Sequence, residues 1–300
     1  MGYVYSITAV LLWGLVQIPI KMAKAPGRVG VMISMPAGLA AITLILALQG
    51  GPLLQALTPW DWFLIVVSGI ATFPAATFAY FEAVQRAGIT AAAPITRLTP
   101  VLVVLISAAL PGGRLLWPSV MAAVLIFVGG VFLAKGAHRA HPIETHRELR
   151  IGLLYAFGAC LMWVVSFLAV DGISDDVPRS LVVFYGLITG AVVHYAVMGA
   201  LGRLKEVRNL TRRDVVCYCL QGVGSFALGY WAMFESIELL GVGRSSVITG
   251  TWPVPATILG IVVFHERMNR QKVAGVVLLV MSAVLAGLGP WLEGFLLTLF

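Results

Sequence analysis

The chain has 300 residues, of which 60% are hydrophobic and only 11% are charged, and its formal net charge at pH 7 is +7. Soluble domains carry about 25% charged residues, so this composition excludes an ordinary soluble protein. Apolar runs of about 20 residues, the length that crosses a bilayer as a helix, recur along the whole chain. They are continuous rather than alternating, which favours membrane-spanning helices over a β-barrel.

Ten runs of this kind follow one another in chain order. We expect spanning helices at roughly residues 3–21, 29–48, 62–85, 90–110, 116–135, 151–171, 180–201, 215–239, 243–264 and 272–290. The connections between them are mostly short, and none has the composition of a soluble domain. The predicted fold class is therefore an all-α integral membrane protein of ten transmembrane helices, with the lipid bilayer as a partner.

Positive charge is distributed unevenly between the two sides of the predicted bundle. Sixteen of the 20 Lys and Arg residues fall at the loops that join spans 1–2, 3–4, 5–6, 7–8 and 9–10, and three fall on the other side. Cytoplasmic loops are enriched in Lys and Arg. This bias predicts a multi-pass protein of the plasma (inner) membrane with both termini outside the cytoplasm. It also explains the net charge, so no nucleic-acid partner is predicted.

The two halves of the chain resemble each other when one is shifted by about 150 residues. A shift of 153 places Glu82 on Glu235, Thr96 on Thr249 and Pro100 on Pro253, and a shift of 150 places Trp13 on Trp163. The pattern indicates an internal duplication, with repeats at 1–138 and 151–290, a linker at 139–150 and a C-terminal tail at 291–300. Each repeat has five spans, an odd number, so the second repeat is expected to be inverted.

Three short motifs point to a known family. They are "LLWG" from Leu11 to Gly14, "YFEAVQRAGITAAAPITRLTP" from Tyr80 to Pro100, and "HERM" from His265 to Met268. The chain resembles the EamA-type branch of the drug/metabolite transporter superfamily, and the resemblance implies a ten-helix carrier of small metabolites. Two departures stand out. Gly112-Gly113-Arg114 has no glutamate where the second repeat has Glu266, and Arg97 stands where the family is small or polar.

Arg97 is the clearest candidate for a functional residue. It lies about two turns inside the fourth predicted span, and a charge inside the membrane is a functional hypothesis by default. It could anchor a carboxylate or phosphate, or it could form a structural ion pair with Glu82 or another buried acid. Prolines near the same depth predict helix breaks that expose carbonyl groups to a cavity: Pro94, Pro100, Pro253 and Pro255.

Two glutamates and several aromatic residues are further candidates for a substrate site. Glu82 and Glu235 are matched between the repeats, and each could face a central cavity or extend to the interface from its helix end. The aromatic candidates could line the transport path or serve only as packing and interface residues. They are Trp13, Trp163, Phe78, Trp231 and Tyr80.

Together these features favour a secondary active exporter of a small zwitterion, such as an amino acid, working by alternating access between inverted repeats. A carrier of organic cations or drugs, a carrier of phosphorylated sugars or lipid-linked phosphate, and a non-transporting membrane subunit stay open as alternatives. No nucleophile–base or metal-ligand motif is present, so we predict neither an enzyme nor a cofactor or metal. A coupling proton or counter-substrate, the direction of transport and the oligomeric state are not specified by these patterns.

Overall fold

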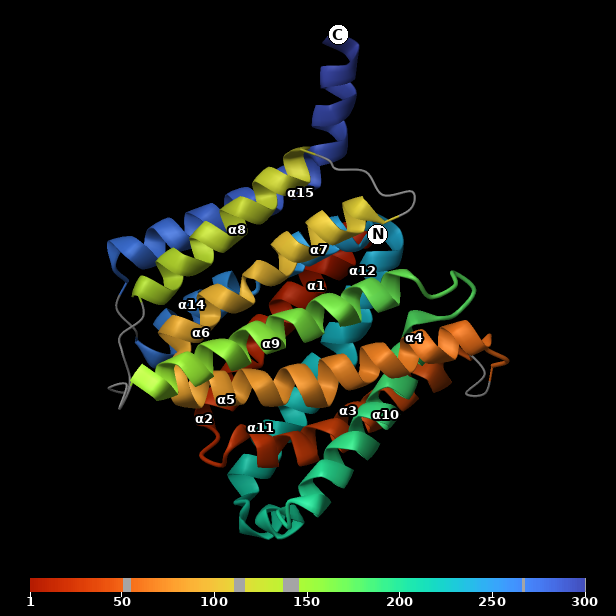
Figure 1. Cartoon of the computed structure of the whole chain (residues 1–300), viewed down its shortest axis with the longest axis vertical. Coiled ribbons are helices and arrows are strands. Elements are labelled where there is room, and N and C mark those ends of the chain that lie inside the picture. Colours follow the sequence, from red (N-terminus) through yellow and green to blue (C-terminus); the bar gives the residue numbers. More distant parts are fainter. Residues whose placement is uncertain (51–54, 111–116, 137–145, 266–267, 300) are drawn as a thin grey trace.

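The computed structural model describes residues 1–50, 55–110, 117–136, 146–265 and 268–299 (Figure 1). Within these ranges all regular secondary structure is helical, and ten helices or runs of consecutive helices are long and apolar enough to cross a membrane. The ten-span, all-helical prediction is therefore confirmed. The motif Gly112-Gly113-Arg114, the residues Glu266 and Arg267, and most of the predicted linker lie outside the described residues.

The spans of the first half are α1 (Gly2–Leu15) with α2 (Gln17–Met22), α3 (Gly27–Gln49), α4 (Pro59–Ile70) with the π-helical η1 (Ala71–Ala76) and α5 (Thr77–Ala87), α6 (Ile89–Thr96) with α7 (Leu98–Ala109), and α8 (Trp117–Gly136). The second half contains α9 (His146–Asp171), α10 (Arg179–Ala200), the short 3₁₀ helix η2 (Leu204–Asn209), α11 (Arg212–Gln221) with the π-helical η3 (Gly222–Gly229) and α12 (Tyr230–Leu240), α13 (Val242–Thr249) with α14 (Pro253–Phe264), and α15 (Arg270–Leu299).

Proline explains where four of these helices end. Proline has no backbone N–H, so the carbonyl four residues before it loses its helical partner. The helices α1, α4, α6 and α13 end at Leu15, Ile70, Thr96 and Thr249, four residues before Pro19, Pro74, Pro100 and Pro253. Pro36 does not interrupt α3, because the Tyr195 hydroxyl donates a hydrogen bond to the freed carbonyl of Met32.

The two halves repeat the same local features. The breaks at Arg97 and Gly250, the π-helical segments η1 and η3, and the positive-φ residues Gly88 and Gly241 (φ 77° and 79°) all recur at matched positions. Helices α4 and α11 both begin with a threonine side chain that accepts a hydrogen bond from an aspartate N–H three residues on, Thr58 with Asp61 and Thr211 with Asp214. The local structure therefore supports the duplication.

Each half packs mainly against the other. Helix α1 packs on α12 and η3, and its counterpart α9 packs on α5 and η1, while α3 packs on η3 and α10 on η1. The last spans, α8 and α15, lie side by side at one edge of the bundle (Figure 1). The contacts are preserved when the halves are exchanged, which agrees with an inverted repeat.

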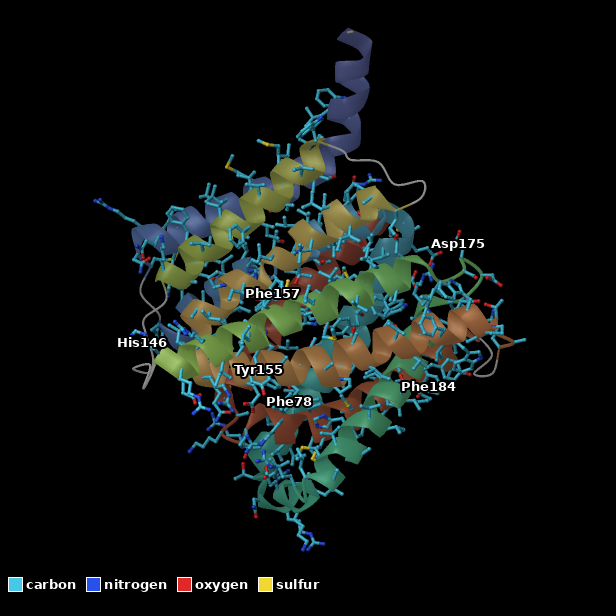
Figure 2. The ribbon with its side chains drawn as sticks, viewed as in Figure 1. Phe78, His146, Tyr155, Phe157, Asp175 and Phe184 are labelled. Atoms are coloured by element: carbon cyan, nitrogen blue, oxygen red, sulfur yellow. The ribbon has the colours of Figure 1, made fainter. Side chains whose placement is uncertain are left out.

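The two ends of the bundle differ in charge. One end, called the basic end here, holds Lys24, Arg86 and Arg147, and the other, called the acidic end, holds Asp175 and Glu238. Figure 2 shows His146, at the start of α9, and Asp175, in the loop after α9, at these opposite ends. The substrate path of a carrier would have to connect them.

Candidate functional site

A cavity of about 190 Å³ lies between the two halves, at the level of the helix breaks. Both breaks contribute to it: Thr96 and Arg97 line it from the first half, and their counterparts Thr249 and Gly250 line it from the second. Further lining residues come from both halves, on α1, α2, α5, α7, α9, α11, η3, α12 and α13 and in the turn before α14. They are mostly aromatic or uncharged polar residues: Trp13, Gln17, Thr77, Tyr80, Phe81, Thr99, Trp163, Phe167, Gln221, Ser225, Phe226, Tyr230, Ser246 and Trp252.

Arg97 lines this cavity from the break between α6 and α7. Its side chain is 8% exposed, its Nη1 donates a hydrogen bond to the carbonyl oxygen of Gly250 at 2.9 Å, and its Cζ lies 4.8 Å from the ring centroid of Trp252. Gly250 is the repeat counterpart of Arg97 itself. This hydrogen bond joins the matched helix breaks of the two halves, so the guanidinium lies between the halves.

The local sequence explains how Arg97 reaches this position. Pro100 ends α6 at Thr96, and Arg97 is the one residue between the end of α6 and the start of α7. In the second half, Gly250 lies outside regular helix, in the turn between α13 and α14, so its carbonyl can accept from a side chain. The stem of Arg97 packs on Gly130 of α8, where an added Cβ would lie 2.4 Å from Arg97 Cγ.

The guanidinium has no carboxylate partner in the part of the chain that the structure describes. The ion pairs found there do not include Arg97, and Arg97 is the one charged residue among the described lining residues. A guanidinium has five N–H donors, and the carbonyl of Gly250 takes one. Donors therefore remain for an anionic group in the cavity. The alternative, a structural ion pair between Arg97 and Glu82, is not formed, because Glu82 pairs with Arg86.

Aromatic residues form two walls of the cavity, one from each repeat-matched tryptophan. The Trp13 ring meets Tyr230 edge-on at 5.2 Å between centroids, and Trp163 packs against Tyr80 at 5.7 Å. Trp13 Nε1 donates to Ser225 O at 3.4 Å. Trp163 Nε1 is buried and makes no hydrogen bond of normal geometry with any described residue, although the Tyr230 hydroxyl is near it. Trp163 Nε1 is therefore a further unused donor, in addition to those of Arg97.

The remaining sequence candidates lie away from this cavity. Glu82 accepts a hydrogen bond from Arg86 Nε at 3.1 Å and lines, with Phe78, a separate pocket at the basic end. Figure 2 shows Phe78 beside Tyr155 of α9, with ring centroids 6.4 Å apart. Glu235 accepts from Trp231 Nε1 at 2.8 Å, and neither residue lines the central cavity. The structure thus brings Arg97, Trp13, Trp163 and Tyr80 together and separates the two glutamates from them.

The four prolines predicted to break helices differ in their effect on the structure. Pro100 lines the cavity and Pro253 begins α14, and each lies four residues after a helix end. Pro255 is in the first turn of α14, where a backbone N–H has no helical partner anyway, and it interrupts nothing. Pro94 lies inside the eight-residue α6, where it removes only the bond to the carbonyl of Thr90.

Several lining residues were not among the sequence candidates. Gln17 and Gln221 carry no charge, so the search for intramembrane charges passed over them. Thr96 and Thr249 had a usable signal, because they are identical at matched positions immediately before the two breaks. The repeat match combined with the break positions would have identified this pair.

The comparisons with known proteins agree with this architecture. The family model described as "EamA-like transporter family" matches residues 1–135 and 150–288, which is most of the chain. The chain belongs to the EamA-like transporter family. A multi-pass membrane transporter, rather than an enzyme, follows from that membership, and the resemblance to the drug/metabolite transporter superfamily is confirmed.

Relatives of this EamA-like chain carry transporter names. An uncharacterized transporter of Archaeoglobus fulgidus is 26% identical, covering 75% of this chain and 76% of its own. The aromatic amino acid exporter YddG of Ancylobacter novellus is 29% identical over 62% and 63%, and a putative sugar uptake protein of Listeria monocytogenes is 26% identical over 55% and 56%. One solved structure, 23% identical, matches the fold with a TM-score of 0.80 over 97% of this chain and 98% of its own.

Proposed function

We propose that this EamA-like transporter is a secondary active exporter of a small carboxylate-bearing metabolite, an amino acid or a close relative, and that it works by alternating access between its two halves. The observation that carries the proposal is the buried guanidinium of Arg97, which faces the cavity with no described acid beside it. A carboxylate binds a guanidinium through two parallel hydrogen bonds, and the unused N–H of Trp163 supplies a third donor.

The walls of the cavity suit the rest of an amino acid. The faces of Trp and Tyr attract an ammonium group through cation–π interactions, and Gln17, Gln221 and Ser225 add neutral polar groups. The same rings offer apolar area for an aliphatic or aromatic side chain. The relative named as an aromatic amino acid exporter supports this class of substrate, and its name also supports export.

The geometry distinguishes among the alternatives. A carrier of organic cations would be expected to place a carboxylate in the cavity, and the described residues place none there. A phosphorylated substrate would bring a dianion to a single arginine. The cavity volume of about 190 Å³ lies below the roughly 300–1,000 Å³ of sites for drug-sized ligands, which disfavours drugs and lipid-linked substrates.

We also propose that the basic end faces the cytoplasm, so that both termini lie outside it in the plasma membrane. The support is the clustering of Lys and Arg at that end, since cytoplasmic loops attract positive charge. Loading from the cytoplasm is the direction that export requires.

Uptake into proteoliposomes tests this function. The panel contains labelled phenylalanine, leucine, glutamate, tetraethylammonium and glucose 6-phosphate, and the proteins compared are wild type, Arg97→Gln and the matched control Arg150→Gln, an exposed arginine on α9. We expect uptake of one or more neutral amino acids by wild type and the control, and loss of it in Arg97→Gln. Uptake of the cation or the sugar phosphate alone, or equal amino-acid uptake by Arg97→Gln, would contradict the proposal.

A further inference from the structure

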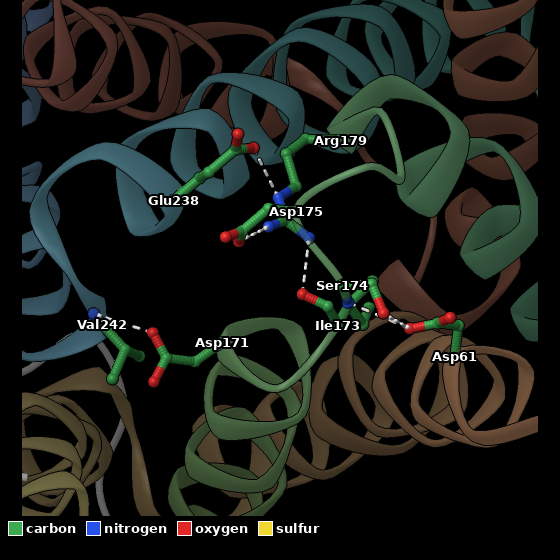
Figure 3. A network of polar contacts seen from close by, with 8 residues as sticks. All are labelled: Asp61, Asp171, Ile173, Ser174, Asp175, Arg179, Glu238 and Val242. Carbon is green, nitrogen blue, oxygen red and sulfur yellow. Dashed lines mark hydrogen bonds and ion pairs between the residues drawn. The ribbon is translucent and has the colours of Figure 1, made fainter. Parts of the chain in front are cut away.

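A buried arginine joins three segments at the acidic end of the bundle. Arg179, the first residue of α10, is 3% exposed, and its Nε lies 2.8 Å from Glu238 Oε2 on α12. The guanidinium also contacts Ile173 O at 3.4 Å and Asp175 Oδ1 at 3.6 Å, both in the segment that follows α9 (Figure 3). A single side chain therefore joins α10, α12 and the end of α9 at this end.

Three further hydrogen bonds reinforce these connections. Asp171 Oδ1 accepts a hydrogen bond from the backbone N–H of Val242, which ties the end of α9 to the start of α13 (Figure 3). Deeper in the bundle, the hydroxyls of Ser6, Ser236 and Ser245 form a buried chain of hydrogen bonds across α1, α12 and α13. Polar contacts therefore tie α9, α10, α12 and α13 of the second half to one another near the acidic end, and Ser6 ties α1 of the first half to them.

The internal repeat identifies the residue at the basic end that corresponds to Arg179. Asp61 Oδ1 accepts from Ser174 N at 3.0 Å and holds the loop before α10, and its counterpart Asp214 accepts from Lys24 N at 2.7 Å and holds the loop before α3. Pro178 and Pro26 are the N-cap residues of those two helices. The first helical residues after them, Arg179 and Gly27, are therefore structural counterparts.

The partner of Arg179 also has a counterpart. The shift of 153 residues that relates α12 to α5 places Glu238 on Gln85. Where the acidic end has an ion pair, the basic end has a glycine and an amide. The basic end therefore cannot form the same ion pair.

A pocket occupies the corresponding space at the basic end. It has a volume of about 270 Å³ and is lined by Gly27 and Gln85 together with Phe78, Phe81, Glu82 and the basic residues Lys24 and Arg28. Phe81 lines both this pocket and the central cavity, and its ring packs on Gly27, where an added Cβ would lie 2.7 Å away. Phe81 therefore lies between the central cavity and this pocket at the basic end.

We propose that the Arg179–Glu238 ion pair is a gate lock, which holds the acidic end closed while the basic end is accessible, and that each transport cycle breaks and re-forms it. This inference rests on the proposed alternating access. When the halves exchange conformations, the counterparts Gly27 and Gln85 close the basic end without an ion pair. The lock therefore biases the resting carrier towards the state described here, in which the ion pair is formed.

Cysteine labelling in nanodiscs, where both ends of the protein meet solvent, tests the lock without any substrate. The background carries alanine in place of Cys160, Cys217 and Cys219, with one probe at a time: Ser6→Cys in the buried hydroxyl chain near the acidic end or Val84→Cys in the basic-end pocket. A polar maleimide should label Val84→Cys readily and Ser6→Cys slowly. Adding Arg179→Gln or Glu238→Gln should speed labelling of Ser6→Cys about tenfold, as loss of a half-buried ion pair implies, and should slow labelling of Val84→Cys.

The opposite responses of the two probes separate gating from unfolding, which would speed both. Arg179→Lys should restore much of the slow labelling of Ser6→Cys, since it keeps the charge. Two outcomes in Arg179→Gln and Glu238→Gln would overturn the lock. In one, the labelling rates of both probes stay within twofold of the background; in the other, both rates rise together. A failed substrate panel with these labelling shifts intact would instead overturn only the proposed substrate.

Discussion

Replacing Arg97 with methionine is expected to separate function from stability. In the folded protein, burial of an ion without a counter-ion costs several kcal/mol. The hydrogen bond to Gly250 O at 2.9 Å returns about 1.5–3 kcal/mol, and the Trp252 ring at 4.8 Å about 2 kcal/mol. These opposing contributions nearly cancel, so Arg97→Met should change the free energy of unfolding by less than about 2 kcal/mol, in the stabilising direction if burial dominates.

Substrate binding should respond very differently to the same substitution. Removing one partner of a buried charge pair costs about 2–5 kcal/mol, which corresponds to a Kd about 30-fold to several thousand-fold higher. Thermal unfolding of the purified protein, followed by the fluorescence of its eight tryptophans, measures the first quantity. Equilibrium binding of the amino acid identified in the transport panel measures the second.

The outcome that would refute this reasoning is the reverse pattern. If Arg97→Met unfolded more than about 10 °C below the wild type, which for a chain of this size means several kcal/mol, while binding stayed within a few-fold, Arg97 would be a structural residue. Arg97→Lys provides an intermediate case. It keeps a charge but loses the planar pair of donors, so its affinity should lie between those of the wild type and Arg97→Met.

Other positions give further tests. Gly130→Ala should lower substrate affinity although the charge of Arg97 is kept, because the new Cβ would lie 2.4 Å from Arg97 Cγ. The control is Gly158→Ala, whose new Cβ would meet no atom within 4 Å. Equal affinities of the two variants would contradict the expectation. Gly222→Ala should lower the unfolding temperature by several degrees, because its Cβ would lie 2.1 Å from the backbone oxygen of Ser34; an unchanged temperature would show that the helices can separate there at no cost. Tyr195→Phe should destabilise the protein by about 1–3 kcal/mol in a denaturant or thermal assay, because Met32 O loses its donor, and a neutral result would mean that α3 does not need this bond. Glu82→Gln and Glu235→Gln should keep at least half of wild-type uptake, since both side chains lie off the central cavity; loss comparable to that in Arg97→Gln would return them to the substrate site.

The sequence predicted those features that depend on the physical properties of a single residue or of one continuous run. Apolar runs of membrane length identified the ten spans, and the lone charge at Arg97 identified a residue that lines the cavity. Matched prolines predicted interruptions in the fourth and ninth spans, since the missing N–H of Pro100 and Pro253 acts locally. The same rule applied to Pro19 and Pro74 would have predicted the ends of α1 and α4.

Features that depend on which helix faces which were beyond single-sequence reasoning. Glu82 and Glu235 lie on cavity-forming spans, but their direction depends on helix rotation, which is set by packing against the other half. The ion pair of Arg179 was also missed, because Arg179 lies at a helix end among three aspartates and reads as part of a solvated loop. Only the fold shows that Glu238, 59 residues away, comes to meet it.

The most direct test of the account compares an amino acid with its methyl ester, which lacks the carboxylate charge. Binding of both compounds is measured to the wild type and to Arg97→Met, with the amino acid identified in the transport panel. The account predicts that the wild type prefers the free acid by about 30-fold or more and that Arg97→Met binds acid and ester with similar affinity. An equal preference for the acid in both proteins would show that the carboxylate is held elsewhere and would contradict a substrate site centred on Arg97.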